Sequence, residues 1–376
     1  MNKNPSVAAN ISPPRQPYPA VSVVIPLYNA EKYISECLNS LLAQTFQNFE
    51  VIVVDDCSTD SSCTIVENYR EKFDERLTLS HMDKNSGSGA LPRNKGMMLS
   101  RGEYIAFLDN DDLYTKTALE ELYTLAKDFD ADVVYCEDNY RVHSNGTGIH
   151  KEFGDKIKPI NKPTFESDNL VERVSKILHG KYHVPQWCKL VRRSFIFEQE
   201  IFFPDTRPSD DDIWTYGLIF HAKKFLRVPN ITYIRRLTED SIMRVKKTPQ
   251  QVITFWSNPV LLGLKSLDNL MSRHEFFQKN PQYRYAVLQM FVNNKLNIPL
   301  KDSFQLQPFV IYEILKQEFG AKLGEQDVLI AALCTAFNTQ QKINVVNIQQ
   351  FQQFAAQAQA RIAQLEAEVN RLKSKE

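Results

Sequence analysis

Two aspartates separated by one residue, Asp109 and Asp111, follow an apolar segment that starts at Tyr104. Side chains at positions i and i+2 of an extended segment point the same way, so the two carboxylates can converge. Mg²⁺ and Mn²⁺ prefer such hard oxygen ligands and usually keep water and substrate phosphate as their other ligands. The spacing therefore favours a divalent-metal site for a phosphorylated ligand. The alternative is a solvated loop in which Asp112 or Thr115 caps the next helix.

A second acidic pair, Asp55 and Asp56, ends the apolar segment FEVIVVDD. A carboxylate at this position can accept hydrogen bonds from a base N–H or a ribose hydroxyl. The alternative is a capping role for the acidic and serine residues here, which is our interpretation of Asp60. Farther along, NSGSGALPRNKG supplies glycines that permit a close backbone approach, and Arg93 supplies a guanidinium suited to phosphate.

The elements that must position these residues alternate between strand and helix. Runs of β-branched residues indicate buried strands, and we expect Asn29 to cap the helix that presents Ile34 and Leu38, with Glu31 in its first turn. Such alternation predicts an α/β fold with a mostly parallel sheet and helices on both faces. The expected strands are 21–25, 49–56, 76–81, 104–108 and 131–136, and the other expected helices are 61–72, 90–100 and 115–128.

Both acidic pairs fall where ligands bind such a sheet, beyond the carboxyl ends of its strands. The pattern becomes irregular over 140–210, and a helix is then expected at 213–224. The segment FLRVPNITYIRR (225–236) is interpreted as edge strands, and 246–345 as helices with polar connectors.

Composition excludes several classes of protein. The 376 residues include 45 Lys plus Arg and 45 Asp plus Glu, so nothing indicates a basic nucleic-acid binder. No apolar run reaches the ~18 residues of a membrane span, and the first residues lack the apolar core of a secretory signal. The six scattered cysteines form no CxxC, so we expect reduced thiols in a cytoplasmic protein and neither a disulfide framework nor a zinc site.

The order VSVVIPLYNAEKYISECLNSLLAQTFQNFEVIVVDDCSTDSS … NSGSGALPRNKGMMLSRGEYIAFLDNDD resembles glycosyltransferase family 2, the inverting group with the GT-A fold. The resemblance is strong over 20–140 and weaker through 187–196, 208–224 and 232–242. It implies a Rossmann-like domain that uses a nucleoside-diphosphate sugar, with UDP-sugars foremost. The last third of the chain carries no such resemblance.

The resemblance assigns a nucleotide-binding role to four residues near the first two strands. Pro26 and Tyr28 match the position where the first strand meets the nucleotide, with the tyrosine ring against the base. Asp55 or Asp56 matches the acid that holds the uracil or the ribose, and we favour Asp56.

The same resemblance assigns the phosphate and metal side. Asp109, Asn110 and Asp111 match the family's DxD-type motif, in which Asp111 binds Mn²⁺ or Mg²⁺ through the diphosphate, Asp109 assists, and Asn110 lies near the ribose. Arg93 falls in the family's arginine-asparagine element. Ser or Ala is more usual at the position of Asn110.

The catalytic base is expected in the acidic run Asp210-Asp211-Asp212. The family places an acidic pair before a helix, with an aromatic residue three positions later. Aligning Trp214 and the Ala222–Lys224 segment makes Asp211 the base, and Asp212 is the second choice. The alternative is that all three merely cap the helix that follows.

The implied reaction is inverting transfer of the sugar to a hydroxyl of a glycan or glycolipid, with Trp187 and Lys189 on the acceptor side. The alternative for these two residues is packing and a surface charge. The family implies a bacterial cytoplasmic setting in lipooligosaccharide or capsule biosynthesis, with peripheral inner-membrane contact as a further expectation.

Two other functions stay open. One is a binding or scaffold protein on a decayed GT-A fold, against which Asp111 and the acidic run argue. The other is a sugar-nucleotide nucleotidyltransferase, whose glycine-rich phosphate loop has no counterpart in PLYNAEKY. A processive polymer synthase is disfavoured because it usually brings transmembrane helices.

The segment 346–376 carries apolar residues spaced alternately by three and four. β-Branched residues at one seam position and leucines at the other favour a parallel two-stranded coiled coil, so we expect a homodimer. The alternative is a solvated helix, or one packed on its own domain. The expected organisation is an arm (1–18), a GT-A domain (19–245), a helical domain (246–345) and a coiled-coil helix (346–376). The seam residues are Ile348, Phe351, Ala355, Ala358, Ile362, Leu365, Val369 and Leu372.

Overall fold

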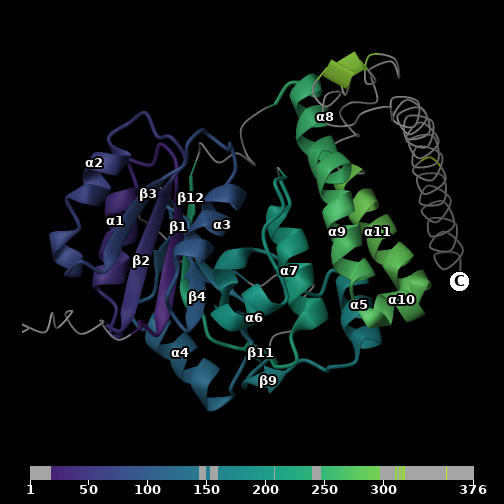
Figure 1. Ribbon diagram of the computed structural model, residues 1–376, viewed down its shortest axis with the longest axis horizontal. Coiled ribbons are helices and arrows are strands. Elements are labelled where there is room, and N and C mark those ends of the chain that lie inside the picture. Colours follow the sequence, from purple (N-terminus) through teal and green to yellow (C-terminus); the bar gives the residue numbers. More distant parts are fainter. Residues whose placement is uncertain are drawn as a thin grey trace, which may run out of the picture. The chain divides into compact units, whose positions relative to one another are not determined.

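The computed structural model describes residues 18–143, 150–152, 160–206, 208–238 and 247–296, with single positions 310, 313, 314, 316, 317 and 353 beyond them. The chain divides into two compact units (Figure 1). The first comprises 1–203 and 214–238, and the second comprises 204–213 and 239–376. The predicted arm, apart from Tyr18, and the predicted coiled coil, apart from Gln353, lie outside the described residues.

The first unit is built around strand β1 (Val21–Leu27), which is buried along its whole length. Strand β2 (Phe49–Asp55) lies parallel beside it and β3 (Leu77–His81) lies parallel beside β2. On the other side of β1, strand β4 (Tyr104–Phe107) also runs parallel. Strands β1, β2 and β4 are buried on both faces, as expected for a parallel sheet flanked by helices, whereas β3 is partly exposed.

The sheet continues beyond β4 with β10 (Lys189–Arg192), which runs antiparallel to both β4 and β6 (Val133–Cys136). Strand β11 (Phe225–Val228) follows β6, and β9 (Thr164–Phe165) forms the edge. The eight strands therefore lie in the order β3-β2-β1-β4-β10-β6-β11-β9.

A second sheet has four strands in the order β5-β12-β7-β8. It contains β5 (Leu113–Tyr114), β12 (Tyr233–Leu237), β7 (Asn139–His143) and β8 (His150–Glu152). The expectation that 225–236 forms edge strands is wrong, because β11 lies between β6 and β9 and β12 lies between β5 and β7. Their partners are two to five residues long, too short to show a period in the sequence.

Helices α1 (Ile34–Leu42), α2 (Ser62–Glu67) and α3 (Ala90–Leu99) connect the first four strands. A Cβ at Gly96 of α3 would come within 2.3 Å of the Val24 side chain, so glycine permits this helix to approach β1 closely. The remaining helices of this unit are α4 (Ala118–Asp128), α5 (Leu170–Leu178), α6 (Arg193–Glu198) and most of α7 (Asp210–His221).

Two predicted helix starts are wrong. Asn29 does not cap α1, because its backbone is left-handed (φ 45°) and its side chain accepts a hydrogen bond from the Thr59 amide at 2.8 Å. The N-cap of α1 is Tyr33, with no side-chain cap bond. Helix α4 begins three residues later than expected, since Leu113–Tyr114 extends to pair with β12.

In the second unit, α8 (Pro249–Asn258) starts with a capping box between Thr248 and Gln251. It continues through a π-helical turn (Pro259–Gly263) into α9 (Leu264–Ser272). Helices α10 (Glu275–Lys279) and α11 (Pro281–Leu296) follow. None of the helices in the described ranges combines the length and apolar character needed to cross a bilayer.

Candidate active site

The candidate site begins at the carboxyl ends of β1 and β4. The chain leaves β1 toward β2 and β3 on one side and returns to place β4 on the other, so the strand order reverses between β1 and β4. Such a switch point leaves a crevice in which α/β sheets bind ligands. The side-chain amide of Asn110 donates a hydrogen bond from Nδ2 to the carbonyl oxygen of Pro26 at 3.0 Å, which joins the two strand ends.

Asp109 is held by two donors from distant parts of the sequence. Its Oδ1 accepts hydrogen bonds from the Arg93 guanidinium at 2.8 Å and from the side-chain amide (Nε2) of Gln186 at 2.9 Å. The Arg93 guanidinium also lies over the Phe203 ring. Sequence reasoning missed Gln186, and no local pattern marks it. Arg93 therefore supports the acidic loop, and its predicted contact with phosphate stays a prediction.

Asp111 is a partly buried carboxylate beside another carboxylate. Burial, followed by the charge of Asp109, raises its pKa to about 6. Within the described residues its side chain makes no hydrogen bond or ion pair with another residue, although its carbonyl oxygen accepts from Arg236 Nε at 3.0 Å. Burying an anion is costly, and burial here outweighs the charges of Arg235 and Arg236, so this carboxylate suits a bound cation.

Asp112 anchors the acidic loop to β12 and does not cap a helix. Its carboxylate accepts from the Tyr233 hydroxyl at 2.7 Å and from the Arg236 amide at 2.6 Å. The Tyr233 oxygen also accepts from the Asp109 amide at 3.2 Å. Burial and the neighbouring aspartates raise the pKa of Asp112 well above its usual range. Thr115 does not cap either, because the N-cap of α4 is Thr117.

Asp56 is buried and holds the glycine-containing loop. It accepts hydrogen bonds from the Ser86 amide at 2.8 Å, the Ser86 hydroxyl at 2.9 Å and the Gly87 amide at 3.0 Å. Gly87 has φ 73°, a conformation that glycine adopts easily. The predicted contact of Asp56 with a base or ribose is untested.

Asp55 is turned toward a different set of partners. Its Oδ1 accepts from the Ser58 amide at 3.0 Å, and its Oδ2 lies 3.1 Å from His81 Nδ1. Burial acts to raise the pKa of Asp55, but hydrogen bonds from Ser58 and His81 outweigh it, so the pKa is lowered. Just beyond β1, Tyr28 exposes 48% of its surface, as a ring that stacks on a ligand requires.

Trp187 and Lys189 lie inside the protein. The Trp187 ring stacks on Tyr233 with centroids 4.4 Å apart. Lys189 is only 1% exposed, so it is not a surface charge. Its ammonium donates to the carbonyl oxygens of His183, Val184 and Pro185 at 3.1, 3.2 and 2.7 Å. Both residues fix the segment before β10, and their acceptor-side role stays a prediction.

Asp210, Asp211 and Asp212 form the first turn of α7 in the second unit. The expected helix start at residue 213 is therefore wrong, and the three carboxylates lie within the helix and not before it. Asp211 Oδ1 accepts from the Asp212 amide at 3.0 Å. The Asp212 carboxylate binds the ammonium of Lys295 on α11. An acidic first turn also complements the helix dipole.

Comparison with known proteins places the chain in a family. Residues 22–197 match the model of Glycosyl transferase family 2. Glycosyltransferase GlyG of Streptococcus pneumoniae serotype 4 is 31% identical over 226 residues, which cover 60% of this chain and 73% of GlyG. The chain belongs to glycosyltransferase family 2.

Other family 2 relatives match the chain over part of their length. EpsH of Bacillus subtilis is 34% identical over 229 residues, which are 60% of this chain and 63% of EpsH. The poly(ribitol-phosphate) beta-N-acetylglucosaminyltransferase TarS of Staphylococcus aureus is 32% identical over 206 residues, 54% of this chain and 33% of TarS. The chain thus spans less than two thirds of the length of these two relatives.

A solved structure shares the fold of this family 2 chain. The crystal structure of S. aureus TarS 1–349 with UDP-GlcNAc superposes with a TM-score of 0.60 and 23% identity, covering 85% of this chain and 88% of that one. The predicted α/β fold of the GT-A type is confirmed.

Proposed function

We propose that the chain is an inverting glycosyltransferase that moves a sugar from a UDP-sugar to a hydroxyl of a bacterial surface glycan or glycolipid precursor. The observation that carries the proposal is the contact of Asn110, which lies between Asp109 and Asp111, with the end of β1 at the switch point. Membership in family 2 supports the reaction class. TarS is a poly(ribitol-phosphate) beta-N-acetylglucosaminyltransferase with a solved UDP-GlcNAc complex, which supports a UDP-sugar and a polymer acceptor.

A divalent cation fits the residues present. Asp111 offers a partly buried carboxylate that forms no ion pair in the described ranges, and burial, with a smaller effect of the Asp109 charge, raises its pKa. We propose that Asp111 binds Mn²⁺ or Mg²⁺ and that Asp109 assists. When bound, such an ion neutralises charge on the leaving diphosphate.

The other roles are assigned to residues of the chain itself. We propose that Tyr28 stacks on the base, Asp56 accepts a hydrogen bond from the nucleoside, and Asn110 lies near the ribose. Asp211 accepts the proton of the acceptor hydroxyl as its oxygen attacks the anomeric carbon from the face opposite the leaving group. One such displacement inverts the configuration without a covalent intermediate.

The proposal is tested by nucleotide release from a panel of UDP-, GDP- and dTDP-sugars, with Mn²⁺ and with excess chelator. We expect Mn²⁺-dependent release from one or more UDP-sugars, lost in Asp111→Ala. Binding of UDP without release from any donor, in the presence of acceptor extracts, would support a binding protein on this fold instead. Release of pyrophosphate from a sugar phosphate and a nucleoside triphosphate would indicate a nucleotidyltransferase.

A further inference from the structure

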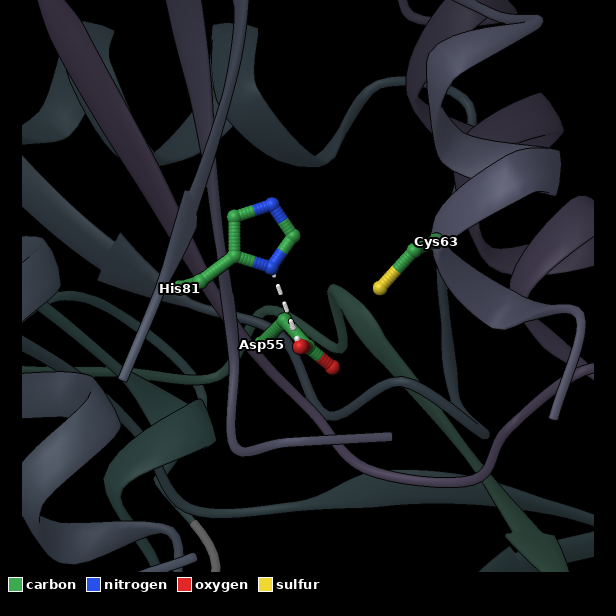
Figure 2. Close-up of side chains that lie close together, drawn as sticks. All are labelled: Asp55, Cys63 and His81. Carbon is green, nitrogen blue, oxygen red and sulfur yellow. Dashed lines mark hydrogen bonds and ion pairs between the residues drawn. The ribbon is translucent and has the colours of Figure 1, made fainter. Parts of the chain in front are cut away.

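Three side chains with metal-binding chemistry meet on the first unit (Figure 2). Asp55 comes from the end of β2, His81 from the end of β3 and Cys63 from the first turn of α2. One ligand atom from each residue lies within 4.8 Å of the others. In Figure 2 the Cys63 sulfur points toward the Asp55–His81 pair.

We propose that Asp55, Cys63 and His81 form a second metal site, for a borderline-soft divalent cation of the Zn²⁺ type. One thiolate, one imidazole and one carboxylate are the ligand types that Zn²⁺ takes in a tetrahedral site. Three protein ligands leave the fourth position for water. Mg²⁺ and Mn²⁺ prefer oxygen ligands, so this set discriminates against the ions proposed for Asp111.

The fold sets this arrangement through strand register. Asp55 and His81 are direct partners across the parallel β2–β3 pair, so their side chains leave the sheet on the same face. Asp55 Oδ1 accepts the Ser58 amide at 3.0 Å, which fixes the carboxylate and leaves Oδ2 for His81. Such a supporting bond to a ligating carboxylate is a recurrent feature of metal sites.

A metal ion can reach the cluster from solvent, and the three side chains can take the protonation states that zinc binding requires. The Asp55 side chain is 5% exposed, whereas His81 is 57% exposed and opens the cluster to solvent. Zinc bonds of about 2.0–2.3 Å draw the ligands closer together, and the exposed imidazole exchanges its contact with Asp55 for a bond to the ion. On binding, the neutral imidazole carries its proton on Nε2 and the Cys63 thiol releases one proton to solvent.

The ligands stand at positions 55, 63 and 81, a spacing that matches none of the cysteine and histidine patterns of zinc sites. The expectation that these cysteines bind no zinc followed from the missing CxxC alone. The strand pairing that joins Asp55 to His81 is a tertiary feature.

The test is a titration of the full, metal-stripped chain with Co²⁺, a spectroscopic substitute for Zn²⁺. We expect a cobalt–thiolate charge-transfer band that saturates at one equivalent and is displaced by Zn²⁺. Cys63→Ser abolishes the band, whereas Cys57→Ser, whose thiol donates to the Met82 carbonyl, keeps it. Asp111→Ala also keeps it, because that residue belongs to the other site.

His81→Gln is the second variant. Its side chain is exposed, so we expect the variant to fold as the wild type does, which circular dichroism verifies. We expect the affinity for Zn²⁺, measured by competition with a chromophoric chelator, to fall by ~100-fold or more. Loss of a hydrogen bond that only supports a ligand would have a smaller effect. The proposal is overturned if no charge-transfer band forms, if Cys63→Ser retains it, or if Cys57→Ser alone removes it.

Discussion

The aspartates at the carboxyl ends of the strands differ in how the protein holds their side chains. Asp109, Asp56 and Asp112 are each bound by donors from elsewhere in the fold. Asp111 has no such partner among the described residues, and burial raises its pKa to about 6. Asp109 is therefore held in place by the protein, in keeping with the assisting role proposed for it beside Asp111.

Replacing Asp111 by Asn removes the anionic ligand while keeping the size of the side chain. We expect sugar transfer to fall by ~100-fold or more, because an amide oxygen replaces a carboxylate at the metal. Steady-state nucleotide release at saturating Mn²⁺ measures this. Asp83→Asn, on an exposed residue, is the matched control and should behave as wild type. Wild-type turnover of Asp111→Asn contradicts the assignment.

The two candidates for the base are distinguished by a pair of variants. Asp212 binds Lys295, whereas Asp211 accepts the amide of the next residue. We expect Asp211→Asn to reduce turnover by ~100-fold or more with donor affinity preserved, the usual contribution of a general base. Asp212→Asn should chiefly lower the stability of the second unit. If Asp212→Asn is inactive and Asp211→Asn is active, the roles are exchanged.

At the scale of elements, strand β12 supports the acidic loop. Tyr233 of this strand contacts Asp109 and Asp112 through its hydroxyl and Trp187 through its ring. The loop is therefore positioned by residues that lie more than 70 positions later in the chain. The helix and strand periods predicted β4 and α4 but not this support.

Removing the Tyr233 hydroxyl should loosen the acidic loop. Tyr233→Phe leaves the buried Asp112 carboxylate with one donor fewer, which we expect to lower the free energy of unfolding by ~1–3 kcal/mol. The Mn²⁺ concentration for half-maximal activity should rise as well. Denaturant titration and metal titration measure the two effects. Tyr285→Phe, on an exposed tyrosine, serves as the control and should change neither.

We expect the stability of the protein to depend on pH through His183, in the segment before β10. Burial, followed by the charge of Lys189, lowers the pKa of His183 from 6.5 to about 4. The unfolded chain therefore binds a proton at a higher pH than the folded one. Above pH 6.5 His183 is neutral in both states and does not lower the stability. As the pH falls from 6.5 toward 4, the unfolded chain binds the proton and the folded chain does not, so the free energy of unfolding decreases.

His183→Gln should remove this contribution to acid sensitivity. Between pH 7.5 and pH 4.5 we expect the free energy of unfolding to fall by ~2 kcal/mol less in the variant than in the wild type. Thermal or urea unfolding at the two pH values provides the measurement, with the exposed His179→Gln as the matched variant. An equal loss in wild type and His183→Gln contradicts the assignment.

At the scale of the whole molecule, the chain joins a GT-A unit to a helical unit, and the acidic run belongs to the second. The first turn of α7 thus lies in a different unit from the Asp109–Asp111 loop. The predicted coiled coil over 346–376 lies outside the described residues, apart from Gln353, and stays a prediction.

Truncation tests the predicted homodimer. Deleting residues 346–376 should lower the molar mass in solution to that of a monomer, because the heptad seam is removed. Multi-angle light scattering measures the mass, and Mn²⁺-dependent nucleotide release should persist as evidence of an intact site. The same oligomeric state before and after truncation contradicts the coiled coil.

The sequence by itself determined five strands of the central sheet, β1, β2, β3, β4 and β6, and the positions of the acidic strand ends. Runs of apolar and β-branched residues favour buried parallel strands, and a chain that enters a loop directly after such a run delivers its next residues to the edge of the sheet. These are local consequences of burial and period, so Asp56, Asp109 and Asp111 could be singled out without a structure.

Only the tertiary structure decided which side chains meet. The contact of Asp109 with Gln186, the place of β12 between β5 and β7, and the pairing of Asp55 with His81 all join distant segments. Asn29 has a left-handed backbone, and its side chain accepts a hydrogen bond from the Thr59 amide in the neighbouring loop. Strand register and long-range hydrogen bonds fix these contacts, and neither can be recognised from the periodicity of the sequence.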